Sequence, residues 1–245
     1  MQHDLGFAHF LGQADALSHF LLAALLLMSL ATWYLIASKA WRMRVLRREA
    51  AAFQTRFWEA TDLNEAAVLL REHGVRDPFS HLVHHALRAV AQHANRGGRR
   101  MIDAGGADEF LTRALRRAME QDTARLEYGH TVLASVASSA PFVGLFGTVW
   151  GIYHALLAIG ISGQSTLDKV AGPVGEALIM TALGLAVAIP AVLAYNAFSR
   201  ANRLLLAELD GFAHDLFAFL STGNRAAPPV RDGALYVLRP DAEAA

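Results

Sequence analysis

The sequence of 245 residues contains no cysteine. Disulfide bonds and thiolate metal sites are therefore excluded, although the absence of cysteine does not by itself locate the protein. The sequence also lacks net formal charge, because 22 Lys and Arg balance 22 Asp and Glu. Apolar residues make up 54%, modestly above the roughly 45–50% of soluble domains. We expect no nucleic-acid partner, no cofactor and no metal.

Charged residues are missing from three long blocks, and this distribution decides the class of protein. Residues 16–38 and 128–167 contain no Asp, Glu, Lys or Arg, and residues 170–199 contain only Glu176. A bilayer core requires about 20 predominantly apolar residues of helix. We predict an all-α integral membrane protein with transmembrane helices at 16–38, 128–157 and 170–199. The first block is too long for a signal-peptide core, and acidic rather than basic residues precede it.

Basic residues predict the orientation of these helices. Residues 1–15 contain no Lys or Arg, and residues 158–169 contain only Lys169, whereas the other flanks are rich in Arg. Basic flanks stay on the cytoplasmic side of a membrane. We therefore expect residues 1–15 and the hairpin 158–169 outside the cell membrane, and residues 39–127 and 200–245 in the cytoplasm.

The region 39–127 is predicted to be helical. The first helix should continue to about Trp58, and Asp62 with Glu65 resembles a capping box before a short helix that Gly74 ends. Asp77 and Pro78 are typical of the start of the next helix. The glycine-rich residues 94–110 should form a linker.

Helices two and three are expected to extend into this cytoplasmic helical region. No strong breaker separates residue 108 from the second block, which favours one continuous helix. Beyond the third block, apolar residues recur at helical spacing and predict helix–helix contact, before a loose tail from Ser221: Leu205, Leu209, Phe212 and Leu216.

Small residues at helical spacing mark the second and third blocks. Each stripe carries one central hydroxyl, Thr148 or Thr181. Helices in lipid associate through close approach of small residues. Two interpretations stay open from the spacing alone: packing between the two helices, or two polar positions that line a narrow path or face a partner helix. The small residues are Pro141, Gly144, Gly147, Gly151 and Ala155 in the second block, and Ala177, Gly184 and Ala188 in the third.

Glu176 is a candidate functional residue, because a carboxylate within a membrane costs at least about 2.5–3.5 kcal/mol and is rarely incidental. The alternative is a position near the outer interface, since Lys169 precedes it by only seven residues. Glu176 and Thr181 are five residues apart and therefore about 140° apart around a helix. If Thr181 faces a path, Glu176 should face a neighbouring helix.

Other candidate chemistry in the sequence is weak. The spacing of His81, His84 and His85 could hold a metal, but a helical His pair needs further ligands, and we expect solvated or interfacial histidines. His154 could contact a water-filled space. The sequence shows neither a nucleophile–base pair nor a phosphate-binding loop that would indicate an enzyme, so we do not expect one.

Two segments, SAPFVGLFGTVWGI and VAGPVGEALIMTALGLAVAIPAVLAYN, closely resemble the MotA/TolQ/ExbB proton-channel family, and its ExbB/TolQ branch in particular. The ExbB side of that branch fits better than the TolQ side. The resemblance covers residues 134–198 and agrees with the expected topology. Thr148 and Thr181 match the pore-facing hydroxyls of the family, Glu176 matches its intramembrane carboxylate, and Pro190 lies in its AIPA element.

The resemblance implies a multi-pass protein of the bacterial inner membrane that forms a homo-oligomeric ring, typically a pentamer, among membrane lipids. The ring would enclose an ExbD-like single-span partner with an intramembrane Asp. Proton flow would then drive a TonB-like protein that energises outer-membrane transport. The alternatives are a TolQ-type subunit of the Tol-Pal envelope system and a passive scaffold ring without conduction.

Overall fold

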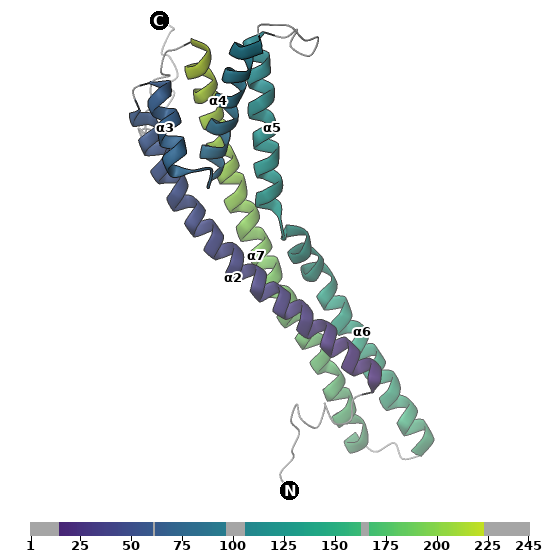
Figure 1. Cartoon of the computed structure of the whole chain (residues 1–245). Coiled ribbons are helices and arrows are strands. Elements are labelled where there is room, and N and C mark those ends of the chain that lie inside the picture. The colour runs from purple at the N-terminus through teal and green to yellow at the C-terminus, as the bar shows by residue number, and fades with distance from the viewer. Residues whose placement is uncertain (1–14, 61, 97–105, 163–166, 223–245) are drawn as a thin grey trace, which may run out of the picture.

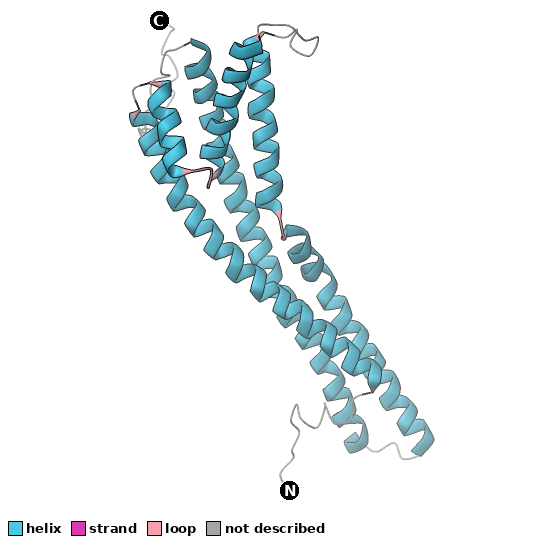
Figure 2. Ribbon diagram, viewed as in Figure 1, coloured by secondary structure: helices cyan, strands magenta, loops and turns pink. Residues whose placement is uncertain are grey.

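The structure is a computed structural model that describes residues 15–60, 62–96, 106–162 and 167–222. Every regular element among these residues is an α-helix, as Figure 2 shows. This confirms the predicted all-α fold. The helices, labelled in Figure 1, are α2 (Ala16–Glu59), α3 (Leu63–His73), α4 (Pro78–Arg96), α5 (Ala107–Glu127), α6 (His130–Ser162) and α7 (Leu167–Thr222).

The described chain is an elongated bundle with two different ends. Helices α2 and α7 run along most of its length, and α6 packs beside them at one end (Figure 1). Helices α3, α4 and α5 pack against the other ends of α2 and α7; we call this part, the described residues within 40–127 and 200–222, the head. Three helical stretches are long and apolar enough to cross a membrane, within Ala16–Glu59, Asp108–Leu157 and Ala177–Ser221. The structure thus confirms three helices that are long and apolar enough to span a membrane.

Local sequence signals set the helix ends in the head. α2 ends at Glu59, one residue beyond the predicted end. The Asp62 carboxylate accepts a hydrogen bond from the Glu65 amide at 2.7 Å, and Gly74 ends α3 with a φ of 72°. The Asp77 carboxylate accepts from the amides of Phe79 and Ser80 at 2.9 and 3.1 Å and thereby caps α4. These predicted caps are confirmed.

The predicted continuous helix from residue 108 into the second block is wrong, because α5 ends at Glu127 and α6 begins at His130. Gly129 between them has a φ of 80°, a conformation that glycine adopts without steric cost. α7, by contrast, is one unbroken helix of 56 residues. At 1.5 Å per residue it is about 84 Å long, far more than a hydrocarbon core of about 30 Å.

Several predicted segments lie partly outside the described residues. α6 ends at Ser162 and α7 begins at Leu167, so both helices extend into the range expected for the hairpin 158–169. The expected periplasmic residues 1–14, the centre of the glycine-rich linker and the tail beyond 222 are outside the described residues.

Two apolar clusters hold the bundle together. In the head, fully buried side chains from α2, α4 and α7 meet, including Phe53, Phe79 and Leu209. The predicted stripe of α7 belongs to this cluster, since Leu205, Leu209, Phe212 and Leu216 are all buried. The second cluster lies between α2, α6 and α7, around Leu25, Ala140 and Met180. Truncation of such a Leu or Phe to Ala typically costs about 2–5 kcal/mol.

Candidate functional site

The two predicted threonines lie side by side between α6 and α7. The hydroxyl oxygens of Thr148 and Thr181 are 2.5 Å apart. The Thr148 hydroxyl also lies 3.1 Å from the carbonyl oxygens of Gly144, on its own helix, and of Ala177, on α7. Thr148 is buried and Thr181 is half-buried. The structure therefore makes one connected hydroxyl pair from residues 33 positions apart in the sequence.

The predicted small residues make this approach possible. A Cβ atom added to Gly144 would lie 2.6 Å from the Met180 carbonyl oxygen, and one added to Gly184 would lie 2.7 Å from the Ala140 carbonyl oxygen. Such distances are below van der Waals contact, so only glycine permits the two backbones to come this close. The two stripes therefore pack against each other within one chain.

The remaining small residues extend this contact along both helices. A Cβ on Gly151 would meet the Ala177 Cβ at 2.8 Å, and a Cβ on Gly147 would meet the Met180 side chain at 2.6 Å. Ala188 is buried further along α7, and Pro141 is half-buried in α6. Within one chain, the two stripes thus pack against each other, as one of the two interpretations predicted. The pore-lining role of the threonines stays a prediction.

Glu176 lies in α7, one turn before the hydroxyl pair, but its side chain is outside the described part of the structure. His154, also in the second block, contacts the Trp150 carbonyl oxygen at 3.2 Å through Nδ1. Its Nε2 lies 3.5 Å from the Asp15 carboxylate at the start of α2. His154 therefore lies against the start of α2, and its contacts within the described residues do not include the hydroxyl pair.

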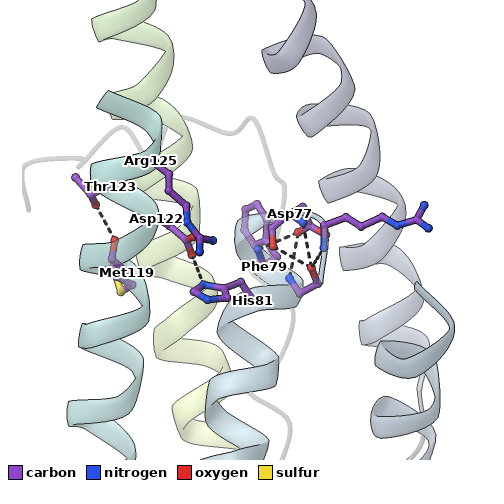
Figure 3. Close-up of polar contacts among 9 residues, drawn as sticks. Asp77, Phe79, His81, Met119, Asp122, Thr123 and Arg125 are labelled. Carbon is purple, nitrogen blue, oxygen red and sulfur yellow. Dashed lines mark hydrogen bonds and ion pairs between the residues drawn. The ribbon is translucent and has the colours of Figure 1, made fainter. Parts of the chain in front are cut away.

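A buried polar pair in the head was missed by sequence reasoning. His81 Nδ1 of α4 lies 2.9 Å from the Asp122 carboxylate of α5, and the Arg125 guanidinium lies 3.6 Å from the same carboxylate. Figure 3 shows how these three side chains lie toward one another. Burial raises the pKa of Asp122, although the His81 hydrogen bond opposes this shift. No sequence signal joins two polar residues 41 positions apart in different helices.

Two further histidines of α4, His84 and His85, lie close to His81. The His81 and His85 rings are 4.5 Å apart, and the His84 and His85 rings 5.8 Å apart. Burial, and then neighbouring positive groups, lowers the pKa of His84 and of His85. Among the described residues, no group of three His, Cys, Asp or Glu side chains is placed to hold a metal ion.

Polar side chains also fix the turn between α5 and α6. Lys39 of α2 donates hydrogen bonds to the carbonyl oxygens of Leu126 and Tyr128 at 2.9 and 2.8 Å. The Asn202 amide of α7 donates to the same Leu126 oxygen at 2.8 Å. The turn is thus connected to both long helices, and we call this set of contacts the junction.

Comparison with known proteins assigns the class of protein. Residues 77–210 match the model of the MotA/TolQ/ExbB proton channel family. The chain belongs to this family, and the hydroxyl pair and the small-residue contact lie within the matched residues.

Individual relatives show which members of the family this chain resembles. The biopolymer transport protein ExbB of Xanthomonas campestris pv. campestris is 43% identical over 229 residues, which cover 90% of each chain. The protein of the same name from Neisseria meningitidis serogroup A is 44% identical over 192 residues, covering 78% of this chain and 86% of the relative. The Tol-Pal system protein TolQ of Pseudomonas aeruginosa is 34% identical over 211 residues, covering 86% and 90%. The higher identities support an ExbB-type role, and none of these names describes an enzyme.

Proposed function

We propose that the chain is a proton-channel and motor subunit of the bacterial inner membrane, with a periplasmic N-terminus and a cytoplasmic head and C-terminus. In this proposal copies of the chain form a ring, expected to be a pentamer, around an ExbD-like single-span partner that carries an intramembrane Asp. Proton flow through the complex moves a TonB-like protein that energises outer-membrane transport. Family membership and the ExbB-named relatives support this role.

The hydroxyl pair is the observation that carries the proposal. A threonine hydroxyl both donates and accepts hydrogen bonds. Thr148 and Thr181 therefore form a short polar relay in an apolar contact, with the Gly144 and Ala177 carbonyl oxygens as further acceptors. Thr181 is the less buried residue of the pair, so a partner helix would approach the pair from the Thr181 side.

A carboxyl group has to carry the proton, because threonine does not ionise near neutral pH. Glu176 and the Asp of the proposed partner are the two candidates. A carboxyl group can accept a proton in one part of a cycle and release it in another. The hydroxyl pair then offers hydrogen bonds to the passing carboxyl group.

The small residues have a structural role in this mechanism. They hold α6 and α7 together inside one chain, so they are not a free surface for the partner helix. The α6–α7 unit instead presents the Thr181 hydroxyl at a fixed depth. One charge moving through 100 mV is worth about 2.3 kcal/mol, so useful work requires several subunits or repeated steps.

Two other roles are consistent with the same fold. TolQ-named relatives favour a subunit of the Tol-Pal envelope system as the second candidate. The neighbouring reading frames distinguish the two, since a gene for a TonB-like protein beside this one favours the ExbB-type role. A scaffold ring without conduction is the third possibility.

Substitution of the hydroxyl pair tests conduction. Thr148→Val with Thr181→Val keeps the side-chain shapes but removes both hydroxyls, and Glu176→Gln removes the ionisable group. Each variant should abolish energised uptake of a TonB-dependent substrate, measured in cells, while the complex still assembles and can be purified.

Thr32→Val is the matched control, because Thr32 is a buried threonine of α2 whose hydroxyl has no hydrogen-bond partner within the described residues. This control should retain uptake. Full uptake in both the threonine double variant and Glu176→Gln would overturn the conducting role and leave the scaffold.

A further inference from the structure

A cavity of about 310 Å³ lies where the first apolar block ends, between α2, the α3–α4 turn and α5. Its volume is within the range of ligand sites, about 300–1,000 Å³. Part of its wall is apolar, from Leu35, Met43, Leu46 and Leu126. Four basic side chains also line it: Lys39, Arg42, Arg76 and Arg125.

Two of these basic side chains have their charge already engaged. Arg125 pairs with the buried Asp122, and Lys39 donates to the two carbonyl oxygens of the junction. The second carboxylate of the wall, Asp77, caps α4 and contacts His73 Nε2 at 3.1 Å. Arg42 and Arg76 are exposed, and neither has a carboxylate partner within 4.0 Å among the described side chains.

The cavity therefore has an excess of positive charge. Burial lowers the pKa of Lys39, the first residue after the expected span 16–38, to about 8, and the nearby Arg42 guanidinium contributes to the shift as the second cause. A negatively charged group placed beside Arg42 and Arg76 would relieve this repulsion. A phosphate ester matches a pair of guanidinium groups in geometry as well as in charge.

The position of the cavity favours a lipid as the source of that phosphate. Tyr34 and Tyr128 line it and are strongly exposed, as is typical of tyrosines at a membrane–water interface. Residues 16–38 contain no Asp, Glu, Lys or Arg, so the cavity opens beside the helix surface that would contact acyl chains. Basic pockets on the cytoplasmic side of transmembrane helices are suited to anionic lipid head groups.

We propose that this cavity binds the head group of an anionic phospholipid of the inner leaflet, with Arg42 and Arg76 on the phosphate and the apolar wall on the glycerol region. This inference rests on the proposed cytoplasmic position of the head. The bound lipid would link α2, the α3–α4 turn and α5 at the membrane surface.

Native mass spectrometry of the purified, delipidated full chain tests the proposal. Phosphatidylglycerol is the anionic probe, phosphatidylethanolamine the zwitterionic one, and glycerol 3-phosphate the soluble phosphate ester. The wild-type chain should retain phosphatidylglycerol in preference to the other two. At about 1 kcal/mol for each basic residue, Arg42→Gln with Arg76→Gln should weaken phosphatidylglycerol binding about 30-fold.

The matched control is Arg44→Gln with Arg71→Gln, which removes the same charge from exposed positions of α2 and α3 outside the cavity. It should keep nearly wild-type binding. An equal loss in both double variants would overturn the proposal, because it would report general surface charge. Equal binding of phosphatidylethanolamine, or binding of glycerol 3-phosphate as tight as that of phosphatidylglycerol, would overturn it as well.

Discussion

At the scale of single residues, the distance between α6 and α7 depends on two glycines. Gly144 and Gly184 face each other, and a Cβ on either would lie 3.0 Å from the Cα of the other. Helices in lipid are held together by dispersion contacts between closely packed backbones rather than by the hydrophobic effect. The position of the hydroxyl pair therefore depends on residues that have no side chain.

Gly144→Ala and Gly184→Ala should each separate the two helices. The added methyl group meets backbone atoms, which cannot rotate away, so we expect a loss of about 1–3 kcal/mol in unfolding free energy. Thermal unfolding of the purified chain in detergent measures this, and the loss of uptake should accompany it because the hydroxyl pair is moved apart.

Gly211→Ala is the control for that substitution. A Cβ at Gly211 in α7 would have no atom within 4 Å. Replacement of a helical glycine by alanine where space is free should stabilise the chain by about 0.5–1 kcal/mol. If Gly144→Ala and Gly184→Ala also stabilise the chain, the close approach of the two helices is wrong.

The sequence predicted the members of this site better than their arrangement. The spacing of glycines and threonines is visible because a helix repeats every 3.6 residues. Whether two such stripes meet each other or a third helix depends on packing between distant segments, which no local pattern encodes. For the same reason the His81–Asp122 pair could not be found, since its members lie in helices joined by a long linker.

At the scale of helices, the junction connects the head to the apolar end of the bundle. The last carbonyl groups of α5 have no partner within the helix, as at every helix end. Lys39 from α2 and Asn202 from α7 supply the missing donors. Two long helices thereby fix the direction in which α6 leaves α5.

Lys39→Met should loosen this junction while keeping the length of the side chain. The carbonyl oxygens of Leu126 and Tyr128 would lose a charged donor. Because the site is partly open to water, we expect a cost of about 1 kcal/mol rather than the larger value of a buried charged bond. Hydrogen exchange of amides around residues 128–133 should become about fivefold faster.

Arg48→Met is the control for the junction, since Arg48 is an exposed basic residue of the same helix. Its exchange rates should equal those of the wild-type chain. Unchanged exchange in Lys39→Met would show that the lysine does not hold the turn.

The junction also explains the error in the predicted helix bounds. Apolar periodicity runs from α5 into α6, and a single glycine is tolerated inside many helices, so Gly129 is a weak signal alone. The break becomes favourable because Lys39 and Asn202 satisfy the freed carbonyl groups. By contrast, the caps at Asp62, Gly74 and Asp77 were predictable, because each involves residues within a few positions of one another.

At the scale of the whole molecule, one chain leaves a large apolar surface uncovered. Large side chains on α6 and α7 are more than 40% exposed, among them Phe142, Phe146, Leu185, Ile189 and Leu193. Lipid covers part of such a surface, and the proposed ring would cover another part. Hydropathy does not distinguish residues that face lipid from residues that face another subunit, because lipid tails are as apolar as a neighbouring helix.

The direction of Glu176 offers a test of the ring. Thr181 faces α6, and Glu176 lies about 140° around α7 from it. A side chain so far from the contact within the chain should face a second copy. Because the sequence has no cysteine, a single Glu176→Cys substitution reports its own neighbours without background.

Oxidation of membranes that contain Glu176→Cys should produce a covalent dimer of this chain, or a crosslink through a short bifunctional thiol reagent. Val187→Cys is the control on the same helix, because Val187 is buried within the chain, at 8% exposure, and its thiol should not reach another copy. Crosslinks from position 176 only to an ExbD-like partner would instead place this carboxylate toward the partner helix. In that case Glu176 and Thr181 would serve different sides of α7, and the partner would contact the glutamate rather than the hydroxyl pair.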